Sequence, residues 1–87
     1  MGILYEVTGY DRNSGRLEAA YEVPENLSVD VKAIAGVHPP DDGLGSYPLT
    51  PEQTAEIAGL LRTVIPERND TDYFLEPYEE QPKAAAR

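Results

Sequence analysis

Cysteine and tryptophan are absent from this 87-residue sequence, and His38 is its only histidine. The absence of cysteine excludes a disulfide scaffold, a thiol nucleophile and cysteine-ligated metals, and a single histidine disfavours a zinc site. No GxSxG, GxGxxG or phosphate-loop glycine pattern occurs either. We therefore expect no catalytic residues, no metal and no cofactor, and an enzyme is the less favoured class of function.

Basic residues are scarce, with seven lysines and arginines against sixteen acidic residues and a net charge of −9. Such a surface repels phosphate groups, which disfavours nucleic acids and anionic membranes as partners. No apolar run approaches the roughly 18 residues of a membrane span, and the first residues lack the pattern of a secretory signal. These absences predict a cytoplasmic protein. Its acidic surface is expected to bind a basic protein partner, to bind a cation, or simply to keep the protein soluble.

Residues Ile3 to Val23 contain two tyrosine- and valine-rich arms around a turn, Asn13-Ser14-Gly15, which predicts a β-hairpin. Gly15 is expected at a positive φ, where glycine carries no Cβ penalty. With this turn, Val7 lies opposite Tyr21. One face then carries Tyr5, Val7, Gly9, Leu17, Ala19, Tyr21 and Val23, and the other carries Glu6, Tyr10, Glu18 and Glu22. The hydrophobic pattern and the turn chemistry agree on this register.

Two helices are predicted after the hairpin. The first runs from Ser28, the expected N-cap, to Gly36, where it ends. The second begins after Thr50, with Pro51 in its first position and Gln53 completing a capping box. Its apolar stripe consists of Thr54, Ile57, Ala58, Leu61, Val64 and Ile65.

A third strand is predicted at Asp72–Glu76, with Tyr73 and Leu75 facing the helices. The fold class is therefore α+β, in the order β-β-α-α-β, with a three-stranded antiparallel sheet and both helices packed on one face. The first strand is expected to be central. Residues 1–76 form the single domain, and the polar residues 77–87 are expected to be a disordered tail.

The outer face of this sheet is the principal candidate for a binding site. The residues predicted to share it are Glu6, Tyr10, Glu18, Glu22, Asp72, Phe74 and Glu76. Aromatic side chains within a charged surface are typical of protein interfaces, although an antiparallel sheet also has an ordinary polar face towards solvent.

The connection between the helices offers an alternative site. Residues 36–49 contain three prolines and three glycines, which exclude regular structure, and long irregular loops are functional or disordered. His38, Asp41, Asp42 and Tyr47 supply titratable groups there. If they clustered around a pocket, a small hydrolase or a metal-dependent enzyme would be favoured over a binding protein.

Three segments carry a resemblance to a known family: Tyr5-Glu6-Val7 followed by Tyr10-Asp11, then Tyr47-Pro48-Leu49-Thr50 with Gln53, then Asp72-Tyr73-Phe74-Leu75-Glu76. Together they resemble a small bacterial domain family of unknown function, over about residues 3 to 76. The resemblance implies a fold and no activity. Some small acidic bacterial domains act as immunity proteins, an analogy of size and charge. The favoured hypothesis is a non-catalytic module, of immunity or inhibitor type, that binds a basic partner.

Overall fold

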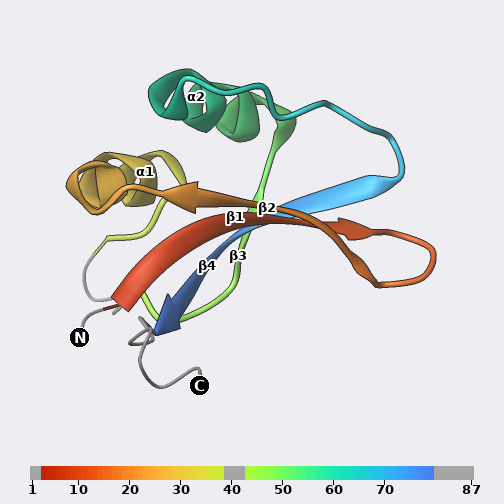
Figure 1. The fold of residues 1–87 in the computed structure, drawn as a ribbon, viewed down its shortest axis with the longest axis horizontal. Coiled ribbons are helices and arrows are strands. Elements are labelled where there is room, and N and C mark those ends of the chain that lie inside the picture. Colours follow the sequence, from red (N-terminus) through yellow and green to blue (C-terminus); the bar gives the residue numbers. More distant parts are fainter. Residues whose placement is uncertain (1–2, 39–42, 80–87) are drawn as a thin grey trace, which may run out of the picture.

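The computed structural model describes residues 3–38 and 43–79, which form an α+β fold with both helices on the same side of an antiparallel sheet (Figure 1). The described elements are β1 (Ile3–Asp11), β2 (Leu17–Val23), a 3-10 turn η1 (Glu25–Leu27), α1 (Ser28–Ile34), β3 (Tyr47–Leu49), α2 (Pro51–Leu61) and β4 (Thr71–Glu79). The strand order is β2-β1-β4-β3, so the first strand lies inside the sheet as expected. The sheet has four strands, and the prediction of three was wrong.

The additional strand, β3, lies in the connection from which the prolines and glycines had excluded regular structure. It pairs with β4 through Tyr47 opposite Leu75 and Leu49 opposite Tyr73, with Pro48 between them. Proline cannot donate a hydrogen bond, which confines it to edge strands. Pro48 alternates with Tyr47 and Leu49, whose backbone groups face β4, so its nitrogen points to the outer edge of the sheet and no ladder bond is lost.

Strand β4 continues to Glu79, three residues beyond the predicted end at Glu76. Pro77 was the reason for ending the strand early. It pairs with Tyr5 of β1, and β3 does not reach it. Its nitrogen faces the side where β4 has no neighbouring strand among the described residues, so proline is tolerated there. The remainder of the expected tail, residues 80–87, lies outside the described residues.

The β1–β2 hairpin follows the predicted register from Tyr5–Val23 to Gly9–Ala19. Beyond Gly9 a bulge shifts the pairing, so Tyr10 lies opposite Leu17 and not opposite Glu18. Gly15 has the expected positive φ of 74°. The turn also includes Arg12, because Asp11 Oδ1 accepts hydrogen bonds from the amides of Asn13 (2.7 Å) and Ser14 (3.1 Å). The bulge absorbs the residue by which the turn differs from the prediction.

The helix boundaries are confirmed in part. Helix α2 begins with the predicted capping box, in which the Gln53 amide donates to Thr50 Oγ1 (3.1 Å) and the Thr50 amide donates to Gln53 Oε1 (2.8 Å). Gly36 ends α1 with φ 84°. Ser28 is not the N-cap, because the 3-10 turn precedes it and its hydroxyl donates to Glu25 O (2.9 Å). Val64 is 81% exposed, since α2 ends at Leu61.

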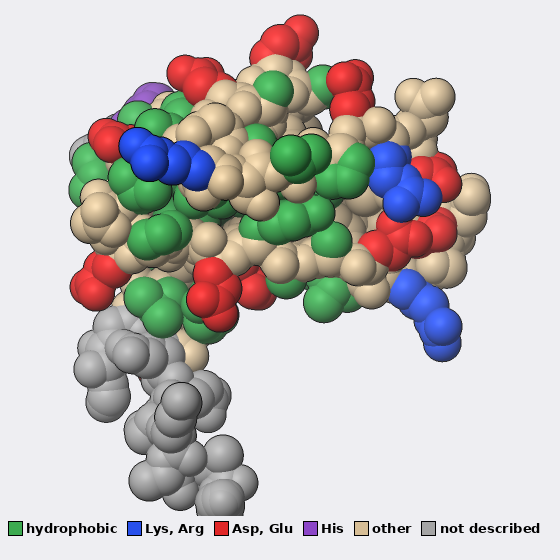
Figure 2. Space-filling view, turned by 45° about the horizontal axis from the view of Figure 1, so that its top comes forward, with side chains coloured by type: hydrophobic (Ala, Val, Ile, Leu, Met, Phe, Trp, Pro, Cys, Tyr) green, Lys and Arg blue, Asp and Glu red, His purple; other side chains and the backbone are tan. Residues whose placement is uncertain are grey.

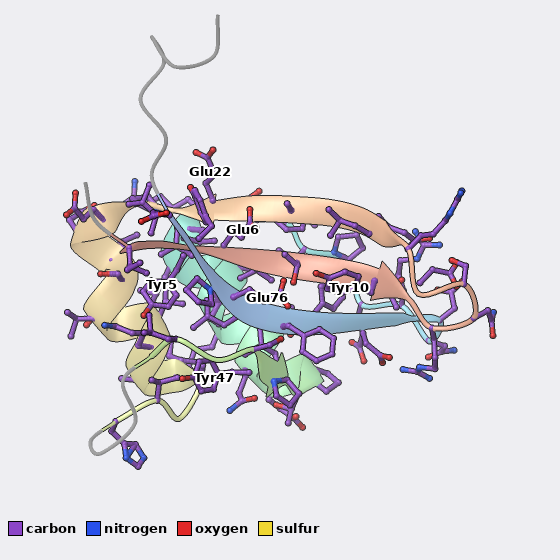
Figure 3. All side chains as sticks on the ribbon, turned by 90° about the horizontal axis from the view of Figure 1, so that it is seen from below. Tyr5, Glu6, Tyr10, Glu22, Tyr47 and Glu76 are labelled. Atoms are coloured by element: carbon purple, nitrogen blue, oxygen red, sulfur yellow. The ribbon has the colours of Figure 1, made fainter. Side chains whose placement is uncertain are left out.

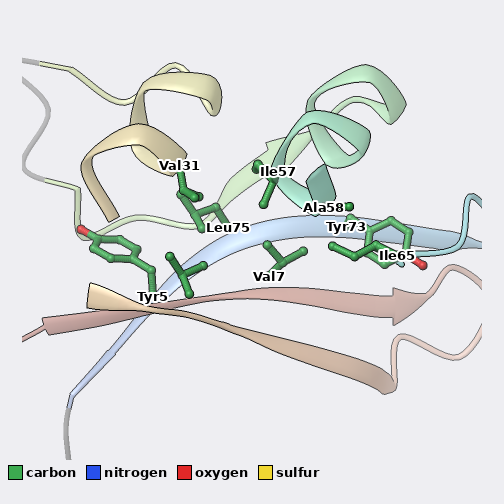
Figure 4. Packing of buried hydrophobic residues seen from close by; sticks show 9 residues of the cluster. Tyr5, Val7, Val31, Ile57, Ala58, Ile65, Tyr73 and Leu75 are labelled. Carbon is green, nitrogen blue, oxygen red and sulfur yellow. The ribbon is translucent and has the colours of Figure 1, made fainter. Parts of the chain in front are cut away.

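The core lies between the sheet and the two helices (Figure 4). Its buried side chains are Tyr5, Val7, Val23, Val31, Ile57, Ala58, Ile65, Tyr73 and Leu75. Val7, Val31, Ile57 and Leu75 are fully buried and stabilise the domain through apolar burial. The core and the two helices lie on one side of the sheet, and the candidate site lies on the other side, which no described helix covers (Figure 1).

Candidate functional site

Three glutamates lie side by side across the outer face of the sheet. Glu6 on β1 is directly opposite Glu22 on β2 and directly opposite Glu76 on β4. Figure 3 shows the three side chains on the side of the sheet away from the helices. Neighbouring strands are about 4.8 Å apart, so the carboxylates form a short line across three strands, which we call the acidic row.

Glu76 is the most tightly held member of the acidic row. Its Oε1 accepts hydrogen bonds from the hydroxyls of Tyr10 (2.8 Å) and Thr8 (3.0 Å), and its Oε2 accepts one from Ser46 (2.8 Å). Partial burial acts to raise the pKa of Glu76, but these three hydrogen bonds outweigh it and the pKa lies below its ordinary value. Glu76 is therefore a fixed, ionised carboxylate.

The pKa of Glu6, at the centre of the row, is shifted in the opposite direction. Desolvation is the largest cause of its raised pKa, and the negative charges of Glu76 and then of Glu22 raise the pKa further. Like charges directly opposite each other in a sheet are destabilising. The ionised acidic row therefore costs the fold stability, and a cation placed over Glu6 would relieve that cost.

An aromatic pair lies beside the acidic row. The rings of Tyr10 and Phe74 meet edge to face, with centroids 5.7 Å apart and an interplanar angle of 73°. Both residues are half-buried, and the hydrogen bond to Glu76 is the main cause of a raised pKa at the Tyr10 hydroxyl. The pair is thus an apolar surface joined to the acidic row through the hydrogen bond from Tyr10 to Glu76.

Asp72 shares this face, but its charge is compensated. The Arg12 guanidinium donates to Asp72 Oδ1 from Nη2 (2.7 Å) and from Nε (3.1 Å). Asp72 therefore attracts a cationic partner less than the acidic row does. We use the name outer-face patch for the six predicted residues that the register places together, which are Glu6, Tyr10, Glu22, Asp72, Phe74 and Glu76.

Glu18 does not belong to the outer-face patch, and its prediction there was wrong. Beyond the bulge, Leu17 takes the position opposite Tyr10 and is 57% exposed. Glu18 instead accepts a hydrogen bond from Thr71 Oγ1 (3.1 Å), on the helix side of the sheet. The bulge exchanges the faces of Leu17 and Glu18, because two successive residues then oppose a single one.

Two of the hydroxyl residues that hold Glu76 were not predicted from the sequence. Thr8 is only 1% exposed although its side chain lies on the outer face. Its alternation with Glu6 and Tyr10 along β1 could have indicated that it lies on this face. Ser46 lies in the loop before β3, thirty residues from Glu76. No local pattern predicts a contact at that separation, since it depends on the unpredicted strand β3.

The loop alternative is only partly described. His38 is exposed, and Tyr47 is half-buried in β3, where its hydroxyl oxygen accepts a hydrogen bond from the Gly45 amide (3.2 Å). Asp41 and Asp42 lie outside the described residues. A cavity of about 830 Å³ opens between α2, the segment 65–69 and the edge of β4, and neither His38 nor Tyr47 lines it. This cavity therefore gives no support to the loop alternative.

Acidic side chains also occur elsewhere on the described surface (Figure 2). Within residues 3–38 and 43–79, no group of three or more histidine, cysteine, aspartate or glutamate side chains is arranged to hold a metal ion. On the helix-bearing side, acidic side chains lie in separate small groups among hydrophobic and basic ones (Figure 2). The described part of the chain also contains no helix of the length and apolarity needed to cross a membrane.

Removing the central charge is expected to stabilise the fold. Glu6→Gln should raise the free energy of unfolding by about 0.5–1 kcal/mol at pH 7, because it removes two like-charge contacts. Since the folded-state pKa of Glu6 is raised, the wild type loses stability as pH rises through that pKa. The advantage of Glu6→Gln should therefore disappear below about pH 4, near the unfolded pKa.

Urea unfolding at pH 3.5 and at pH 7 measures this difference. Glu56→Gln on the exposed surface of α2 is the matched control. Equal effects of Glu6→Gln at both pH values would show that the acidic row carries no repulsion.

Fold and site together define a small α+β protein whose sheet carries acidic and aromatic side chains on its outer face. A model for a family described as "Domain of unknown function (DUF7683)" matches residues 4–76, and the chain belongs to this family. The resemblance to a small family of unknown function is thereby confirmed. No curated protein matches the chain, and no solved structure does.

Proposed function

We propose that this domain is a non-catalytic, cytoplasmic protein-binding module whose outer-face patch recognises a basic protein, in the manner of an immunity or inhibitor protein. The observation that carries the proposal is the acidic row, three glutamates in line on a sheet face that no described helix covers. These carboxylates repel one another, and a site that costs stability is more readily explained by function than by folding. The aromatic pair supports the same proposal, because such anchors are enriched in interfaces.

The two parts of the patch have different roles in this proposal. Glu6 and Glu22 attract the partner over a distance, so they act on the association rate and on its salt dependence. Phe74 supplies apolar area that becomes desolvated on binding, so it acts on the dissociation rate. Glu76 fixes the geometry, because three hydroxyl donors already hold its carboxylate.

The test begins with affinity capture of a partner from a cell extract and its identification by mass spectrometry. The double charge reversal Glu6→Lys with Glu22→Lys should slow association at least about tenfold at low salt, and the loss should shrink at high salt. Phe74→Ala should accelerate dissociation about thirtyfold, corresponding to a hot spot of roughly 2 kcal/mol.

The matched control is Glu52→Lys with Glu56→Lys, which produces the same change in net charge on the exposed surface of α2. The control should bind like the wild type apart from a small uniform change in association rate. If both double variants lose binding equally, net charge alone attracts the partner. If neither changes binding, the outer-face patch is an ordinary solvated surface and the proposal is rejected.

A further inference from the structure

Strand β2 forms one edge of the sheet and carries Glu22, the end member of the acidic row. In the strand order β2-β1-β4-β3 it has β1 on one side and, among the described residues, no strand on the other. Ala20 and Glu22 are exposed. At the opposite edge, β3 is short and contains Pro48. The edge of β2 is longer and free of proline, and such an edge is a template for another strand.

The register fixes which backbone groups of β2 face outwards. The Asp11 amide donates towards β2, to Arg16 O (2.9 Å), whereas the Arg12 amide donates towards β4, to Asp70 O (2.7 Å). The backbone N–H and C=O groups of odd-numbered β1 residues therefore point towards β2. They form hydrogen bonds with the backbone groups of their partners Ala19, Tyr21 and Val23. The N–H and C=O groups of Ala20 and Glu22 consequently point away from β1, to the open side of the sheet.

We propose that the open edge of β2 receives an extended segment of the basic partner as an added antiparallel strand, between the bulge at Glu18 and Pro24. The added strand would bond the outward N–H and C=O groups of Ala20 and Glu22. This inference rests on the proposed function for the sign of the partner's charge. It adds that the partner binds as an extended strand along β2.

Charge complementarity identifies the occupant. Side chains directly opposite each other on neighbouring strands are about 5 Å apart. A lysine or arginine opposite Glu22 would therefore extend the acidic row with a cation and offset its repulsion. A second copy of this chain would instead bring another net charge of −9 to the edge, so self-pairing is disfavoured.

The edge can be blocked without breaking the sheet. Ala20→Pro removes an outward-facing N–H and places a proline ring in the path of the added strand, while every bond from β2 to β1 remains. It should weaken binding about tenfold or more. Ala20→Thr keeps the N–H at the same exposed position and should bind within about twofold of the wild type. Thermal melts of both variants confirm that they fold.

The probe is a random peptide library displayed on phage and selected against the full chain. Enriched peptides should alternate lysine or arginine with β-branched residues, and they should fail to bind Ala20→Pro. A synthetic copy of one such peptide should slow hydrogen exchange at the Ala20 and Glu22 amides of the wild type, and less at residues of α1. The exchange measurement needs no variant, so it decides the question even if Ala20→Pro does not fold.

The outcomes separate this inference from the proposed function. If the double reversal of Glu6 and Glu22 abolishes binding while Ala20→Pro and Ala20→Thr bind alike, the face binds a basic partner and strand addition is rejected. If only Ala20→Pro loses binding, strand addition stands and the charge-based function fails. Failure to enrich any peptide, or protection of the same amides by self-association without peptide, overturns the inference.

Discussion

Replacement of Leu75 by alanine is expected to lower the free energy of unfolding by about 3 kcal/mol or more. Leu75 is fully buried on β4, between Val7 of β1 and Tyr47 of β3, and it faces the helices. Truncating a leucine at such a site removes apolar burial and leaves a cavity, which together cost about 2–5 kcal/mol. The upper part of that range applies because rigid strands flank Leu75 on both sides and prevent the site from collapsing.

The effect is large for a domain of this size. Chains of this length bury a smaller fraction of their surface than larger domains, and typical stabilities are only about 5–15 kcal/mol. Urea unfolding followed by circular dichroism measures the change, and Leu17→Ala is the matched control because Leu17 is 57% exposed. A loss at Leu75 no larger than that at Leu17 would contradict the packing of the core beneath α1 and α2.

Local sequence patterns predicted those parts of the fold that depend on neighbouring residues. The capping box at Thr50 and Gln53 requires side chains three residues apart, and it formed as expected. The alternation in β1 and β4 placed Glu6, Phe74 and Glu76 on the outer face. In each case a short-range rule and the hydrophobic pattern indicated the same structure.

The errors arose where tertiary contacts override the local signal. Pro48 and Pro77 suggested loop and tail, but both lie in strands at positions where the sheet requires no N–H from them. The error at Glu18 is of a different kind, because the bulge accompanies a longer turn that Asp11 caps through local hydrogen bonds, which the hydrophobic alternation does not indicate. The hydrogen bond from Ser46 to Glu76 depends on the unpredicted strand β3, so it could not be predicted from the sequence.

A second large effect is expected at Gly9, where β1 passes beneath the ring of Tyr73. A Cβ atom added at Gly9 would lie 2.8 Å from Tyr73 Cε1 and 3.2 Å from Thr71 Cγ2, closer than side chains normally approach. The ring is not free to move aside, because its hydroxyl donates a hydrogen bond to Pro66 O (2.6 Å). Gly9→Val is therefore expected to lower the free energy of unfolding by about 2–3 kcal/mol through overpacking.

A double-mutant cycle tests that reason. Tyr73→Val destabilises the domain by itself, but it removes the ring, so Gly9→Val in that background should cost nothing or should stabilise the strand, because β-branched residues favour strands. The coupling energy between the two positions should then be about 2 kcal/mol or more, within the range known for residues in contact.

Gly59→Ala is the control, since an added Cβ there meets nothing within 4 Å. It should stabilise α2 by about 1 kcal/mol. If Gly9→Val cost the same with and without the tyrosine ring, the strain would lie in the backbone of β1, and the close packing of Tyr73 on Gly9 would not be its cause.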